Sequence, residues 1–128
     1  FCRRHQIGDA VRNGEVQMLG ASGTVTTLAS VYLDLPRYDR SVVDGMTLDF
    51  DEVIQVSERL RRMACEERAA HPCIGIERAK LVVAGCAVLE AIMRRWTVGR
   101  IRVADRGVRE GILLEMMREA DAKCDGRA

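Results

Sequence analysis

The chain has 128 residues, which is the size of one domain, so we expect no second full domain. Its formal net charge of +1, with 48% hydrophobic and 30% charged residues, gives no global attraction to nucleic acid or to a membrane. No apolar run reaches the roughly 18 residues of a membrane-spanning helix, and the opening residues lack the apolar core of a signal peptide. We therefore expect a cytoplasmic protein with neither nucleic acid nor a membrane as a partner.

The first third of the sequence predicts a leading segment, a short strand and a helix. Residues 1–15 are polar and mixed, with an Asn-Gly turn signal, and we expect a ragged segment there. Val16 to Leu19 is predicted as a strand, and Thr24 to Leu33 as a helix with its apolar residues on one face. Pro36 ends that helix and opens a loop.

The middle of the sequence changes from a strand-like to a helical period after Met46. Asp49 stands three residues before Glu52, which is the spacing of a capping box, and apolar residues then recur at helical spacing as far as Met63. This pattern predicts a strand followed directly by a helix. A short helical piece comes next and is cut by Pro72.

The last third predicts two long helices with a strand between them. The apolar segment Ile76–Trp96 is too long for a strand and is predicted as a single buried helix. Ile101 to Ala104 is predicted as a strand, and the helix after it is expected to bury four apolar side chains that recur at helical spacing. These are Val108, Ile112, Leu113 and Met116. We expect the tail from Ala122 to fray.

The order of these elements indicates an α/β fold, because strands alternate with helices along the chain. Three strands make a thin sheet, since parallel sheets are normally wider and covered on both faces. The chain also begins at Phe1, without a methionine and within a pattern. We therefore expect an incomplete sheet and a fragment of a longer protein.

The stretch "LGASGTVTT", from Leu19 to Thr27, joins the first strand to its helix and allows two interpretations. Gly20 and Gly23 permit close approach of the backbone, and a helix that starts at Ser22 or Thr24 points free N–H groups above the turn, where a phosphate group could bind. Alternatively, the glycines only make a tight turn and Ser22 only caps the helix. A bare G-x-x-G pattern is too common to decide between them.

Arginines near two other helix starts are candidate anion ligands. Arg106 and Arg109 lie three residues apart in "ADRGVREG", although Arg109 could instead pair with Asp105 across one turn. Arg78 stands in the first turn of the long apolar helix, where a cation is unfavourable without a compensating anion. Gly85 lies inside that helix and indicates close packing or the approach of a ligand.

The cysteines and histidines predict neither a metal site nor a nucleophile. The five cysteines are scattered and odd in number, which favours reduced thiols. Cys65, His71 and Cys73 match no familiar zinc spacing. Neither His5 nor His71 is tied to a thiol by its position, and no general acid/base pair of carboxylates stands out, so a cysteine hydrolase has little support.

Four blocks together resemble a known family: "LGASGTVTTLA", "YDRSVVDGMTLDFDEV", "IERAKLVVAGCAVLEAIM" and "IRVADRGVREGILLEM". In this order, between about Val16 and Met117, they are similar to the second domain of the exopolyphosphatase and guanosine pentaphosphate phosphohydrolase family (Ppx/GppA). The resemblance implies an incomplete α/β domain of the ribonuclease H-like, actin-like ATPase class, with three or so strands and about four helices. It divides the chain into a leading segment 1–15, a domain part 16–119 and a tail 120–128.

The resemblance implies a phosphatase whose catalytic residues lie elsewhere. Members of the family carry two phosphate loops and a catalytic glutamate upstream of these blocks, and this sequence contains none of them. The intact protein is expected to remove the terminal phosphate of polyphosphate or guanosine pentaphosphate with Mg²⁺, to bind guanosine tetraphosphate as well, and to form a homodimer. In this chain we identify no catalytic residue and no metal ligand.

The resemblance also assigns residue roles in the cleft. The residues expected to bind phosphate are Ser22, Gly23, Thr24, Arg78, Arg106 and Arg109. The glycines expected to shape the cleft are Gly20, Gly85 and Gly107. The alternative is a non-enzymatic actin-like module for nucleotide sensing or subunit association, which the absence of an acid/base pair also permits.

Overall fold

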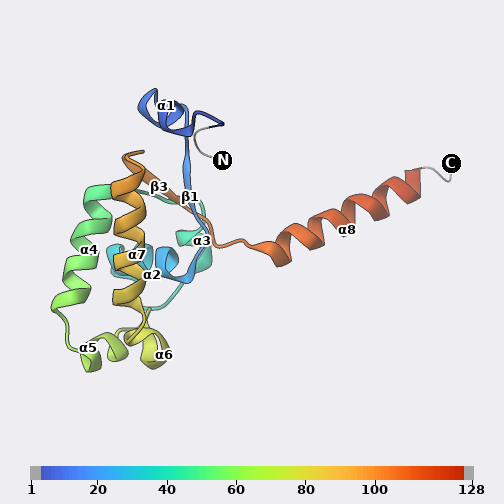
Figure 1. Ribbon diagram of the computed structural model, residues 1–128. Coiled ribbons are helices and arrows are strands. Elements are labelled where there is room, and N and C mark those ends of the chain that lie inside the picture. Colours follow the sequence, from blue (N-terminus) through green and yellow to red (C-terminus); the bar gives the residue numbers. More distant parts are fainter. Residues whose placement is uncertain (1–3, 126–128) are drawn as a thin grey trace.

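The computed structural model describes residues 4–125, which form a three-stranded sheet and eight helices (Figure 1). In chain order the elements are α1 (Ile7–Arg12), β1 (Met18–Gly20), α2 (Gly23–Tyr32), α3 (Arg40–Val43), β2 (Thr47–Asp49), α4 (Phe50–Arg62), α5 (Cys65–Ala70), α6 (Gly75–Ala79), α7 (Val82–Arg95), β3 (Arg100–Val103) and α8 (Val108–Asp125). The α/β class and the three predicted strands are confirmed. The helices are twice as many as the four or so expected: α1 and α3 lie in segments predicted as a leading segment and a loop, α6 was predicted as one helix with α7, and α5 is the short helical piece expected before Pro72. Predictions for Cys2, for the side chain of Cys124 and for residues 126–128 lie outside the described part.

The sheet is mixed, with strand order β1-β3-β2. β1 runs parallel to β3, with Gly20 opposite Val103, whereas β2 runs antiparallel to β3, with Leu48 opposite Ile101. Leu48, Ile101 and Val103 are buried beneath the helices, while Leu19 on the other face of β1 is 61% exposed. Helices therefore cover one face of the sheet, and the other face is open at β1.

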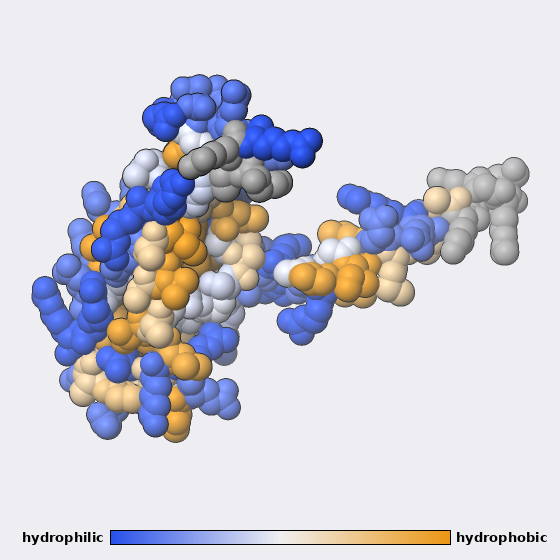
Figure 2. Space-filling model, viewed as in Figure 1, coloured by the Kyte–Doolittle hydropathy of each residue, from blue (hydrophilic) through white to orange (hydrophobic). Residues whose placement is uncertain are grey.

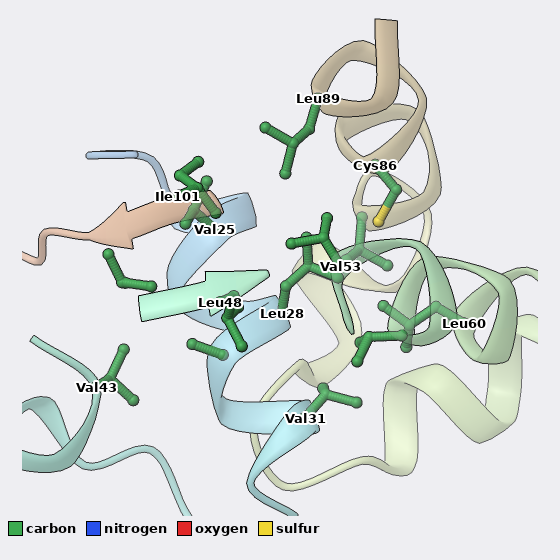
Figure 3. Packing of buried hydrophobic residues seen from close by; sticks show 14 of the residues in the cluster. Val25, Leu28, Val31, Val43, Leu48, Val53, Leu60, Cys86, Leu89 and Ile101 are labelled. Carbon is green, nitrogen blue, oxygen red and sulfur yellow. The ribbon is translucent and has the colours of Figure 1, made fainter. Parts of the chain in front are cut away.

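α2 is the central helix of the molecule. Every residue from Val25 to Val31 is buried, and α2 packs against α4, α7 and β3. Its side chains Leu28 and Val31 lie among residues of the sheet and of α4, such as Leu48 and Leu60 (Figure 3). Its neighbours therefore enclose both its apolar face and polar residues such as Ser30, whose Oγ donates to the Thr26 carbonyl at 2.8 Å. The predicted helix at Thr24 to Leu33 is thus confirmed, with its start one residue earlier.

The capping box predicted at the start of α4 contributes the expected contact. The Glu52 carboxylate accepts a hydrogen bond from the Asp49 N–H at 2.8 Å, which satisfies one of the N–H groups left free at the helix start. Val53, Val56 and Leu60 then face the core at helical spacing. A strand followed directly by an amphipathic helix is what the change of period predicts.

The prediction of a single helix over Ile76–Trp96 is wrong, because the helix is interrupted between α6 and α7. The Arg68 guanidinium donates from Nε to the Ala79 carbonyl at 2.8 Å, and from Nη1 to the carbonyls of Leu60 at 2.9 Å and Met63 at 2.5 Å. A continuous helix would use the Ala79 carbonyl internally. One arginine of α5 thus joins the ends of α4 and α6.

The predicted inward face of the last helix is also wrong. Val108 is 79% exposed, and the other three side chains expected inside are 54–60% exposed. Those three are Ile112, Leu113 and Met116. α8 extends away from the sheet and its helices (Figure 1), and an apolar surface covers its first turns (Figure 2). The helix continues to Asp125, through the region expected to fray. None of the described helices is both long and apolar enough to span a membrane.

Candidate functional site

The candidate site lies where the parallel strands β1 and β3 end. Gly20 and Val103 are paired in register, so the loops that follow them emerge at the same edge of the sheet. Ligands of open α/β sheets bind outside the carboxyl ends of the strands. A pocket of about 410 Å³ lies there. It is lined by Ala21, Ser22, Gly23, Arg40 and the segment Ala104–Glu110.

The first turn of α2 forms one wall of this pocket. Ser22 is the N-cap, and its Oγ accepts a hydrogen bond from the Val25 N–H at 3.4 Å. The first N–H groups of a helix have no acceptor within the helix, and they carry the positive end of the helix dipole. Ser22 therefore caps the helix, as one interpretation of the turn expected, while the N–H groups of Gly23 and Thr24 are left without an acceptor inside α2.

Arg78 of α6 reaches the same turn from the opposite side. Its Nη1 donates to Thr27 Oγ1 at 3.3 Å, and the guanidinium carbon lies 3.6 Å from the place where a Cβ on Gly23 would be. A second pocket of about 230 Å³ lies between them, lined by Gly23, Thr24, Thr27, Arg78, Leu81 and Val82. The structure thus brings Arg78 within contact distance of the α2 start, although the two are about fifty positions apart in the sequence.

Two of the three glycines expected to shape the cleft allow a close approach. A Cβ on Gly20 would lie 2.8 Å from side-chain carbons of Val25 and Ile101. A Cβ on Gly85 would overlap Thr24 Oγ1 and lie 2.9 Å from Thr24 Cγ2. Gly107 differs from them, because the nearest atom to its Cβ would be Glu110 Oε2 at 3.9 Å. Gly85 therefore lets α7 pack directly on the first turn of α2.

Carboxylates pair with two of the three arginines in the larger pocket. Arg106 Nε lies 2.8 Å from Asp44 Oδ2. Arg40 reaches Asp105 Oδ2 at 3.3 Å and Glu110 Oε1 at 3.2 Å. Arg109 takes part in none of the ion pairs found within residues 4–125, so its expected pairing with Asp105 does not form; Asp105 pairs with Arg40 instead. Arg109 is thus the cation of this pocket that remains available to an anion.

The same network changes the pKa of several groups. The Gly107 N–H, the Glu110 N–H and Arg40 together lower the pKa of Glu110 to about 2. Burial and the hydrogen bond to Asp105 raise the pKa of Tyr38 to about 12. The hydrogen bond from Arg106 lowers the pKa of Asp44 below its ordinary value. At neutral pH Glu110 and Asp44 are therefore charged and Tyr38 is a neutral donor.

The described residues hold no group of three or more histidine, cysteine or acidic side chains arranged around a metal. His71 Nδ1 accepts from the Cys73 N–H at 3.2 Å, and the Cys73 thiol donates to the Leu35 carbonyl at 3.3 Å. Burial raises the pKa of the thiols of Cys73 and Cys86. A cysteine nucleophile needs a lowered pKa, so these thiols are poorly suited to the role.

Sequence reasoning missed the residues that hold this site together. Tyr38, Arg40 and Asp44 lie in a segment predicted only as a loop after Pro36, and their partners are more than sixty positions away. Such contacts leave no periodic pattern. The one available signal was the sequence block that contains all three, "YDRSVVDG", which the family resemblance singled out without assigning roles.

Known proteins resemble this chain over most of its length. The chain matches the Ppx/GppA phosphatase family over residues 4–120. It is 24% identical to Exopolyphosphatase 2 of Mycobacterium tuberculosis over 121 residues, which are 88% of this chain and 38% of that protein. It is 36% identical to Exopolyphosphatase 1 of Mycobacterium leprae over 69 residues, which are 54% of this chain and 20% of that protein.

Solved structures show the same fold. A crystal structure of the Aquifex aeolicus member of the Ppx/GppA family matches with a TM-score of 0.76 and 22% identity, over 91% of this chain and 42% of that one. The type II variant of the Aquifex aeolicus Ppx/GppA phosphatase matches with a TM-score of 0.73 and 27% identity, over 78% and 34% of the two chains. These matches confirm the ribonuclease H-like, actin-like class. The chain spans less than half the length of these relatives, and it belongs to the Ppx/GppA phosphatase family.

Proposed function

We propose that the chain forms one wall of the phosphate cleft of a phosphohydrolase that removes the terminal phosphate of inorganic polyphosphate. The observation that carries the proposal is the placement of Arg78 and Arg109, from distant segments, in the two pockets beside the start of α2. Relatives of this chain are named exopolyphosphatases, which supports polyphosphate as the substrate class. Guanosine pentaphosphate is the second substrate that we propose, because it too ends in a chain of phosphates.

The roles within the site follow from charge and from hydrogen-bond donors. The N–H groups at the start of α2, after Ser22, suit the oxygens of a bound phosphate. Arg78 and Arg109 provide charge-assisted hydrogen bonds from either side of this turn. Arg106 is already paired with Asp44, so in this proposal it supports the pocket and does not hold the substrate.

Magnesium would neutralise the phosphates of the substrate in the whole enzyme. The residues described here do not fit its ligand set, since no three carboxylates or histidines gather among residues 4–125 and the acidic groups of the larger pocket are paired with arginines. We therefore assign the metal ligands and the catalytic carboxylate to other parts of the enzyme. A cytoplasmic homodimer is the assembly that we propose for it.

The test compares arginine variants of the full-length protein that contains this chain. Arg78→Gln and Arg109→Gln should each raise KM for polyphosphate roughly tenfold, since a hydrogen bond to a charged group contributes about 1.5–3 kcal/mol. Arg118→Gln is the matched control, because Arg118 lies on α8 in an exposed ion pair with Glu115 and should leave KM unchanged.

Phosphate release measured on the 128-residue chain alone separates the wall from the catalytic part. The chain alone should release no phosphate from polyphosphate or guanosine pentaphosphate. Robust release would contradict the assignment of catalysis to other segments. An unchanged KM in both arginine variants would contradict the proposed phosphate site itself.

A further inference from the structure

A small cluster of side chains outside the phosphate contacts holds the connection between β3 and α8. We call Tyr38, Arg40 and Asp44 the α3 brace, since they lie in α3 or directly beside it. The connection that they contact is Ala104–Gly107, which joins the end of β3 to the first turn of α8. Arg109 stands in that first turn, and the connection lines the larger pocket.

Asp44 makes two contacts to consecutive residues of the connection. Its Oδ1 accepts a hydrogen bond from the Asp105 N–H at 2.9 Å, and its Oδ2 accepts one from Arg106 Nε at 2.8 Å. The Asp44 side chain is 21% exposed, so water competes with these contacts less than at an open surface. One carboxylate therefore fixes both the backbone and a side chain of the connection.

Arg40 and Tyr38 hold the next part of the connection. Arg40 pairs with the carboxylates of Asp105 and Glu110 and donates to the Asp105 carbonyl. The Tyr38 hydroxyl donates to Asp105 Oδ2 at 2.5 Å. Because Glu110 also accepts from the Gly107 N–H at 2.8 Å, Arg40 contacts the residue that caps the first turn of α8. Side chains outside α8 therefore set the orientation of its first turn.

The α3 brace itself is anchored in the core. Val43 at the end of α3 is fully buried, and Asp39 caps the helix by accepting from the Ser41 N–H at 2.9 Å. Directly after Asp44, the Gly45 N–H donates to the Val103 carbonyl at 2.9 Å, and the Val103 N–H donates to the Met46 carbonyl at 2.7 Å. The brace is therefore attached to the sheet by backbone hydrogen bonds, and the connection is held by side chains with a fixed position.

We propose that the α3 brace positions Arg109 for phosphate binding, with Asp44 and Arg40 as its positioning residues. The inference rests on the proposed function of the site. The apolar side chains of α8 are exposed, so packing of α8 against the described part of the chain does little to hold its first turn. Without Asp44, Arg109 keeps its charge but loses its place beside the start of α2. The effect on substrate binding is therefore exerted through Arg109.

The test is a double-mutant cycle between Asp44→Ala and Arg109→Gln in the full-length protein. Asp44→Ala should raise KM for polyphosphate about fivefold and leave kcat nearly unchanged. A change in KM of about fivefold is within the usual range of coupling between neighbouring residues. In the Arg109→Gln background, Asp44→Ala should have no further effect. An equal rise of KM in both backgrounds, or no rise in either, would overturn the role of the brace.

Two further variants separate positioning from general stability. Asp44→Asn keeps an oxygen that can accept from the Asp105 N–H, so it should recover part of the lost affinity. Glu90→Gln is the matched control, because Glu90 pairs with Arg61 at 3.3 Å, is similarly buried and does not touch the connection. Its KM should equal that of the parent, and a rise as large as that of Asp44→Ala would indicate a nonspecific loss of stability and overturn the inference.

Amide hydrogen exchange gives a readout that is independent of activity. In Asp44→Ala the N–H groups of Asp105 and Gly107 should exchange faster, while those of Leu28 and its neighbours in α2 should stay protected, which also shows that the variant is folded. Unchanged exchange at Asp105 would overturn the brace. If Arg109→Gln leaves KM unchanged while Asp44→Ala speeds exchange at Asp105, the proposed role of Arg109 fails and the structural contact of the brace stands.

Discussion

At the scale of single residues, the contact between Gly85 and Thr24 connects the core to the site. Glycine inside a helix costs about 1 kcal/mol relative to alanine, and here the missing Cβ lets α7 lie directly against the first turn of α2. Thr24 is also a residue of the pocket that contains Arg78. The position of the helix start, and thus of its free N–H groups, depends on this contact.

Gly85→Ala should destabilise the protein by about 1 kcal/mol, because overpacking the contact with Thr24 costs more than the gain in helix propensity. Urea unfolding measures the loss. In a Thr24→Ala background, the atoms that the new Cβ would overlap are absent, so the same substitution should cost clearly less. An identical cost in both backgrounds would contradict the contact.

The lowered pKa of Glu110 predicts that its contacts at the start of α8 are lost at acid pH. Its pKa is lowered from 4.5 to about 2, chiefly by the Gly107 N–H, so its contribution is complete above pH 4.5 and is lost as the pH falls toward 2. An NMR titration of the Glu110 carboxyl should show this low midpoint. In Arg40→Gln the midpoint should rise but stay below 4.5, since the larger cause is a backbone N–H. A midpoint near 4.5 in the parent would contradict the cap.

At the scale of elements, α8 is a helix whose apolar side chains are uncovered within the described part of the chain. Its first turn is fixed by the Glu110 cap and by the α3 brace, and its later turns extend from the rest of the fold (Figure 1). Figure 2 shows the apolar surface that results. Substitutions on α8 and in the core should therefore have very different effects.

The double substitution Ile112→Gln and Leu113→Gln should change the free energy of unfolding of the chain by less than about 0.5 kcal/mol, as is usual for exposed positions. Leu60→Ala, at a fully buried position of α4, should cost about 2–5 kcal/mol by comparison. Urea denaturation of the three proteins measures both. A loss of similar size for the α8 variant would mean that these side chains are buried after all.

The sequence predicted elements well wherever local contacts decide them. Asp49 and Glu52 marked the start of α4, and the apolar residues of α2 marked a helix in the core. At the break between α6 and α7, Arg68 of α5 donates to the Ala79 carbonyl, which a continuous helix would use internally. The apolar pattern of the sequence continues across this break, so the pattern did not reveal it. The apolar residues at helical spacing from Val108 predicted a helix correctly, but a periodicity does not say what those residues cover, and in the described part of the chain they are exposed.

At the scale of the whole molecule, the order of strands and helices was enough to predict the α/β class, and the pocket at the ends of β1 and β3 follows from their parallel pairing. The antiparallel pairing of β2 with β3 was not anticipated; β2 follows Gly45, whose φ of +86° lies in the left-handed region that favours glycine. Of the candidate site, Arg78, Arg106 and Arg109 were named in advance as candidates. Arg40 and Asp44, the partner of Arg106, were not, since their contacts join segments that only the tertiary fold brings together.

Gly23 is the lining residue that the two pockets have in common. On the proposed function, a ligand with a single phosphate group would occupy one side of this residue, whereas a linear chain of phosphates that extended past it would meet Arg109 on one side and Arg78 on the other. Contacts on both sides of Gly23 would be made by one molecule, so the second would form at a high effective concentration. The absence of a side chain at this one position would then favour long substrates over short ones.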